Sequence, residues 1–197
     1  MKSLNFLLKE FLEHLPFATG AAILAFAFVF LSRFIGWSFG PEIFEGVHFS
    51  HLFFSAFATS AVYARYKNNF VYAILIGVFG AILIGSISDV IFPYLGALIF
   101  GIDVSFHLPI FEESFLVLLI SGFGALAGRV FKVSHFSHSF HVFLSVFASL
   151  FYLVSFSVFT GLLSFLIVLL LVILAVWLPC CLSDLWFPLL FVRDKQT

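Results

Sequence analysis

The chain has little charge and few cysteines. Charged residues make up 10% of its 197 residues, against about a quarter in a soluble globular domain. Nine lysines and arginines stand against ten acids, so the net charge is −1 and no basic excess indicates a nucleic-acid partner. The two cysteines, Cys180 and Cys181, are neighbours and cannot form an ordinary disulfide with each other. This composition excludes an ordinary soluble domain and a nucleic-acid-binding protein.

Apolar residues are abundant instead, at 63% of the chain. A helix that crosses about 30 Å of hydrocarbon needs roughly 20 mostly apolar residues. Five runs are candidates: Phe17–Leu31, His51–Ala64, Phe70–Ile87, Ser114–Gly128 and Phe140–Trp177. The last of these is long enough for two helices. We therefore predict an all-α, polytopic integral membrane protein with about six transmembrane helices, whose first partner is the lipid bilayer.

The first sixteen residues have a different pattern. Leu4, Leu8, Phe11 and Leu15 recur at helical spacing between charged residues, which favours an amphipathic helix in the membrane interface over a cleavable signal peptide. We predict this interfacial helix over residues 1–16 and one transmembrane domain over residues 17–192.

The basic residues predict the orientation. Six spans with a cytoplasmic N-terminus leave only Arg33 outside and place the other basic residues in the cytoplasm. Those are Lys2, Lys9, Arg65, Lys67, Arg129, Lys132, Arg193 and Lys195. We expect a multi-pass protein of the cytoplasmic (inner) membrane, with both termini in the cytoplasm.

A motif occurs twice in the chain. Residues 48–59 read HFSHLFFSAFAT and residues 138–149 read HSFHVFLSVFAS; SDVIFP at 88–93 later returns as SDLWFP at 183–188. The pattern predicts an internal repeat with halves at roughly 17–93 and 114–188. Histidines and aspartates beside a hydrocarbon phase are costly, which indicates a functional site.

The repeated polar residues fall on helix faces. They step by three or four residues and therefore share one side of each helix. The two sets are His48, His51, Ser55, Thr59 and Tyr63, and His138, His141, Ser145, Ser149 and Tyr152. Two histidines one turn apart can bind one metal ion or relay protons. The serines and threonines could equally bond their own backbone or join neighbouring helices.

Asp89 and Asp184 each allow two interpretations. Each could be a ligand, or a helix-end cap ahead of a proline that stops the helix. Small residues every fourth position, from Ala73 to Gly85, lead to Asp89, so we expect this side chain to face protein rather than lipid.

The motifs resemble the YdjM-like family of membrane-bound metal-dependent hydrolases over about residues 48–188. His51-Leu52 matches the family's first motif, Asp89 with Pro93 partly matches the second, and Phe136-Ser137-His138-Ser139 is similar to the core of the third. Cys180 through Asp184 to Pro188 matches the last, with Cys180 in place of a histidine. The chain departs from the family pattern at Ile91 and Phe92. It departs again at Val133-Ser134-His135, where the arginine of the family's third motif is absent.

The resemblance implies a metal site and a reaction. It implies His51, Asp89, His138 and Asp184 as ligands of one divalent ion, zinc by preference, and an amphiphilic or lipid-like substrate. The ion would activate a bound water, with His141 or His135 as acid or base.

Two other functions stay open. The repeat favours a small inverted-repeat transporter of ions or protons, with one His/Asp set toward each membrane face. A structural membrane protein without catalysis is the third possibility. With six full spans the two His/Asp sets lie at opposite faces of the membrane. A re-entrant hairpin over residues 93–128 would instead bring both sets to the same face.

Overall fold

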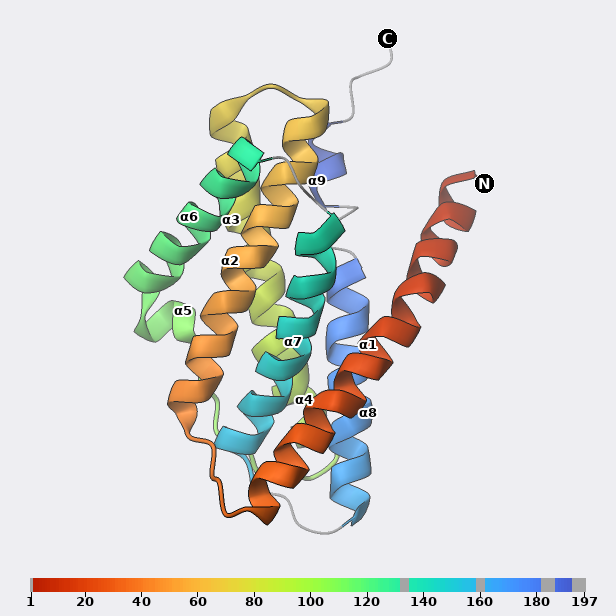
Figure 1. Cartoon of the computed structure of the whole chain (residues 1–197), viewed down its shortest axis with the longest axis vertical. Helices are drawn as coiled ribbons and strands as arrows, with labels where there is room; N and C mark the ends of the chain where they lie inside the picture. Colours follow the sequence, from red (N-terminus) through yellow and green to blue (C-terminus); the bar gives the residue numbers. More distant parts are fainter. Residues whose placement is uncertain (1, 132–134, 159–161, 182–186, 193–197) are drawn as a thin grey trace.

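A computed structural model describes residues 2–131, 135–158, 162–181 and 187–192 (Figure 1). Within these ranges the side chains at 2–14, 33, 135–139, 162, 180–181 and 189 are outside the description. The described chain is helical without a β-strand, which confirms the all-α prediction for these residues. Its elements are α1 (Lys2–Phe34), α2 (Pro41–Tyr66), α3 (Phe70–Ser86), the π-helix η1 (Ile87–Ile91), α4 (Phe92–Ile99), α5 (Pro109–Glu112), α6 (Ser114–Phe131), α7 (His135–Phe156), α8 (Leu162–Cys181) and α9 (Phe187–Leu190).

Long helices run alternately in opposite directions through the bundle (Figure 1). Within the described residues, three segments are long and apolar enough to cross a membrane: Leu15–Ser32, Phe70–Ile99 and Ser114–Phe131. Phe140–Phe156 and Leu163–Pro179 are apolar but shorter. The structure thus indicates a membrane protein, and the six predicted spans stay a prediction.

The two ends of the bundle differ in charge. Arg65, Lys67 and Arg129 lie at the end where α3 begins, and an Arg129 Nη2–H donates to Asn68 there. We call this the basic end; α1 also begins near it (Figure 1). The opposite end, where α2 begins and residues 100–108 form a loop, carries Glu45, Asp103 and Glu112, and we call it the acidic end.

The first helix is longer than its predicted span. α1 continues from Lys2 through Pro16 to Phe34 without a break, so residues 2–16 and the first apolar run form one helix. The placement of residues 2–16 in the membrane interface stays a prediction.

Helix α2 is the centre of the bundle and packs against α3, α6 and α7. Glycines allow the close approach: a Cβ at Gly124 or Gly128 of α6 would clash with the α2 carbonyls of Phe53 or Phe57, respectively. Small residues bring helix backbones together in this way in membrane bundles, where van der Waals packing replaces the hydrophobic effect.

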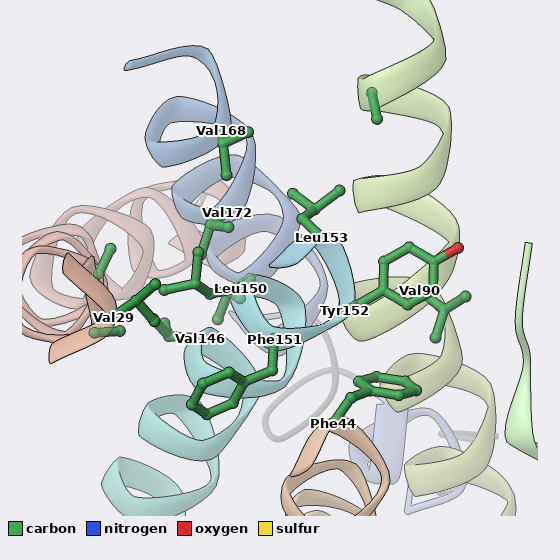
Figure 2. Packing of buried hydrophobic residues seen from close by; sticks show 14 of the residues in the cluster. Val29, Phe44, Val90, Val146, Leu150, Phe151, Tyr152, Leu153, Val168 and Val172 are labelled. Atoms are coloured by element: carbon green, nitrogen blue, oxygen red, sulfur yellow. The ribbon is translucent and has the colours of Figure 1, made fainter. Parts of the chain in front are cut away.

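Helix α1 packs against α7 and α8 in the second half of the chain. Their apolar side chains share one cluster, in which Val29 of α1 lies near Val146 and Leu150 of α7 and Val172 of α8 (Figure 2). Phe44 of α2 joins the same cluster. The first helix of the predicted first half thus packs on the second half, and α6 packs on the first.

The third long helical segment contains Asp89 and does not end at Pro93. Phe92 N–H donates to the carbonyl of Ile87, five residues earlier, and the backbone continues as α4 to Ile99. Pro93 lacks the N–H that would reach the carbonyl of Asp89. The wider π turn before Pro93 accommodates the missing hydrogen bond, and the helical backbone continues past Asp89. The interpretation of Asp89 as a helix-end cap is therefore wrong.

Residues 93–128 contain the end of this helix, a loop and most of α6. Helix α6 covers Ser114–Phe131 and meets the length and apolarity of a full span. This length and apolarity favour a full span over a re-entrant hairpin, and the crossing of the membrane stays a prediction.

Candidate metal centre

A carboxylate lies in the interior of the bundle and two histidines converge on it. Asp89 in the π turn is 0% exposed, and His48 and His51 of α2 are each 1% exposed. Both Nδ1 atoms contact the same oxygen: His48 Nδ1 lies 2.8 Å and His51 Nδ1 lies 2.6 Å from Asp89 Oδ2. An ionised carboxylate only accepts hydrogen bonds, so both Nδ1–H groups donate to it.

Hydroxyl groups satisfy the second carboxylate oxygen. Ser88 Oγ donates to Asp89 Oδ1 over 2.8 Å, and Ser145 Oγ on α7 donates to it over 2.7 Å. One turn further along α7, Ser149 Oγ donates to the backbone carbonyl of Ser88 over 2.9 Å. The predicted second half therefore contributes serines to the aspartate of the first half.

This arrangement explains how a charge is tolerated at this depth. An isolated carboxylate in a low-dielectric interior would cost several kcal/mol, which only close partners can offset. Four donors surround Asp89, and one protonated histidine would make the group electrically neutral. The cluster can therefore hold one positive charge next to Asp89.

The same three residues could hold a metal ion. One ligand atom from each of His48, His51 and Asp89 lies within 4.8 Å of the other two. Two imidazoles and a carboxylate form a ligand set typical of zinc and other first-row metals. Ligands of a tetrahedral zinc ion lie about 3.3 Å apart, given bonds of about 2.0–2.1 Å, so the contacting atoms would separate by about half an ångström.

A histidine of α7 is next to this group. The rings of His51 and His141 are stacked, with centroids 5.7 Å apart and planes inclined by 8°. His141 is 0% exposed. The second histidine of each copy of the repeated motif thus meets its counterpart in the bundle interior.

The structure brings together part of the predicted site. His51 and Asp89 lie in contact, and His141, predicted as an acid or base, adjoins them. The side chains of His138 and His135, and all of Asp184, lie outside the described residues. Their predicted roles stay predictions.

Three partners of Asp89 were missing from the predicted ligand set. His48 belongs to the recognised polar face, and its spacing of three residues from His51 could have placed it in the site. Ser88 adjoins Asp89 in sequence. Ser145 was recognised on a polar face, but no local pattern pairs it with an aspartate 56 residues away.

The described side chains of both polar faces lie in the interior of the bundle. His48, His51, Ser55, Thr59 and Tyr63 are buried, as are His141, Ser145, Ser149 and Tyr152. The prediction that Asp89 faces protein rather than lipid is confirmed.

Comparison with protein families, curated proteins and solved structures finds no match.

Proposed function

We propose that this protein carries a cation across the membrane and binds it at His48, His51 and Asp89. The observation that carries the proposal is the fully enclosed Asp89, whose partners come from α2, α7 and its own π turn. Intramembrane carboxylates with histidine partners are typical of ion and proton pathways. A divalent metal ion of the zinc type fits the ligand set and is the cargo we propose.

The inverted repeat with six spans that the sequence predicts would favour transport. Under this arrangement α2 and α7 are equivalent helices of opposite direction, and His51 and His141 are equivalent residues. Their stacked rings would then lie near the pseudo-two-fold axis at the membrane midplane, where such transporters bind their substrates. The reciprocal packing of α1 on α7 and α8, and of α6 on α2 and α3, agrees with the same symmetry.

π-turns add a second line of support. Single π turns within α-helices are frequent at functional sites, because the extra residue reorients the side chains beside it. Here the π turn carries Asp89 itself. The backbone of the same turn is anchored to α7, because Ser149 Oγ donates to the Ser88 carbonyl.

The test is zinc flux into proteoliposomes that contain a zinc-sensitive dye, with a pH-sensitive dye in parallel vesicles. We expect zinc uptake above that of protein-free vesicles, and an Asp89→Asn variant that loses at least tenfold in rate. Ser50→Ala is the control, because Ser50 lies on the same helix, is exposed, and its hydroxyl bonds the Gly46 carbonyl of that helix rather than the site. Zinc flux equal to that of empty vesicles, or normal flux in Asp89→Asn, would refute the proposal.

A metal-dependent membrane hydrolase is the second candidate. The observation in its favour is that His51 and Asp89, two residues matched by the YdjM-like resemblance, lie in contact. A bound ion would there activate water for attack on an amphiphilic substrate. Turnover of such a substrate by detergent-solubilised, zinc-loaded protein, lost in Asp89→Asn, would favour this function over transport.

A further inference from the structure

We propose that the cation reaches its site from the acidic end of the bundle and that the Phe44 side chain closes this route. The inference deepens the proposed function and rests on it for the identity of the cargo. It concerns a route and its barrier, both built from residues outside the Asp89 cluster.

Ionisable side chains lead inward from the acidic end. His107 lies in the loop before α5, with Nδ1 3.0 Å from Glu112 Oε2 and Nε2 3.5 Å from Glu45 Oε1. Side-chain exposure falls from 55% at Glu112 and 27% at Glu45 to 15% at His107. At His48 it is 1%. Glu45 and His48 are three residues apart on α2 and thus share a face.

Carboxylates at this position would concentrate cations. A group of one sign in a partly enclosed, low-dielectric setting focuses the field and raises the local concentration of counter-ions. Glu45 and Glu112 supply that field at the acidic end. The route therefore starts where a positive ion is attracted.

One aromatic ring separates this group from the buried site. Phe44 is 0% exposed. Its ring stacks on that of His48 with centroids 5.5 Å apart, and it makes an edge-on contact with His107 with centroids 5.9 Å apart. It thus contacts both the last histidine of the route and the first histidine of the site.

Other rings hold Phe44 in position. Its centroid lies 5.4 Å from that of Tyr152 and 5.6 Å from that of Phe156, both on α7 (Figure 2 shows Phe44 and Tyr152). Tyr152 Oη in turn donates to the carbonyl of Ser105 in the acidic-end loop. An apolar constriction of this kind excludes water and ions until it moves.

The experiment measures access to His48 directly. Diethylpyrocarbonate modifies accessible imidazoles, and peptide mass spectrometry resolves His48, His107 and His141. In the wild-type protein we expect rapid modification at His107 and slow modification at His48. Phe44→Ala should accelerate modification of His48 at least tenfold and leave His141 slow, whereas Phe44→Leu, which keeps an apolar plug, should give a smaller increase.

Phe54→Ala is the matched control, because Phe54 is a partly buried phenylalanine of the same helix that packs against Phe140 away from the route. Unchanged modification of His48 in Phe44→Ala would overturn the inference. So would equal acceleration of His48 and His141, because this would mean that Phe44 supports the whole bundle.

The readout separates the two proposals. Access to His48 is measured without zinc and without transport, so accelerated modification in Phe44→Ala would support the route even if zinc flux were absent. Normal zinc flux with unchanged access would retain the site and reject the route.

Discussion

At the scale of single residues, Asp89 is the residue on which the buried polar cluster converges. Its two oxygens have different partners: Oδ2 contacts two imidazoles and Oδ1 accepts from two hydroxyls. In the proposed site the two imidazoles would bind the cation together with Oδ2, whereas the hydroxyls hold the orientation of the carboxylate through Oδ1. The proposed function and the anchoring of Asp89 therefore involve different atoms of one side chain.

A serine substitution tests this division. Ser145→Ala removes one donor to a buried charged acceptor, and we expect the free energy of unfolding to fall by about 1–2 kcal/mol. Ser50→Ala is the control, because the exposed Ser50 hydroxyl only bonds the Gly46 carbonyl of its own helix; its effect should stay below about 0.5 kcal/mol. Equilibrium unfolding with SDS in mixed micelles measures both, and equal losses would contradict the assignment.

Part of the site could be predicted from residue type alone. A histidine pair and an aspartate in an apolar chain are expensive, and this cost identified His51 and Asp89 without any structure. His48 shares their helix face but was omitted from the ligand set because the family resemblance named only His51. Ser145 could not be assigned, because its contact depends on how α7 is placed along α2.

At the scale of elements, glycines of α6 determine how closely it approaches α2. Gly124 and Gly128 lie one turn apart and face the carbonyls of Phe53 and Phe57, while Gly122 of the same helix faces open space. The first two are needed for packing, and the third is not.

This difference predicts opposite effects of the same substitution. Gly124→Ala forces a methyl group against the α2 backbone and should destabilise the protein by about 1–3 kcal/mol. Gly122→Ala should be neutral or stabilising by up to about 1 kcal/mol, because alanine favours the helix. Thermal unfolding in detergent compares the two; equal melting temperatures would show that α6 adjusts its position at little cost.

Helix positions were easier to predict than helix ends. The long apolar runs located the described helices, and the stripe from Ala73 to Gly85 oriented α3 correctly. The third run was predicted to end at Ile87, since Pro93 normally stops a helix, yet a π turn carries the chain on to Ile99. A π turn has no simple sequence period, so this continuation could not be anticipated, although the stripe of small residues did predict that Asp89 faces protein.

At the scale of the whole molecule, the two ends carry opposite charge. Arg65, Lys67 and Arg129 lie at one end, and Glu45, Asp103 and Glu112 lie at the other. Basic residues are retained in the cytoplasm during insertion, so the basic end should be cytoplasmic. The acidic end would then face outward, and the route past Phe44 would open to the outside.

Labelling of intact cells with a membrane-impermeant maleimide tests this orientation. The two native cysteines are first removed by Cys180→Ser and Cys181→Ser. In this background Asp103→Cys should react from outside, whereas Asn68→Cys should react only after permeabilisation. Both positions are exposed, so burial does not limit the reaction. The reverse labelling pattern would invert the proposed direction of access and leave the site itself unaffected.

The packing of α1 also has a consequence for biosynthesis. This helix is synthesised well before the partners it packs against, α7 and α8, which begin only at residues 135 and 162. In contrast, α6 finds α2 and α3 already synthesised. During translation α1 must therefore stay in lipid, or beside the insertion machinery, until α8 has been synthesised. Its docking is thus a late step of assembly.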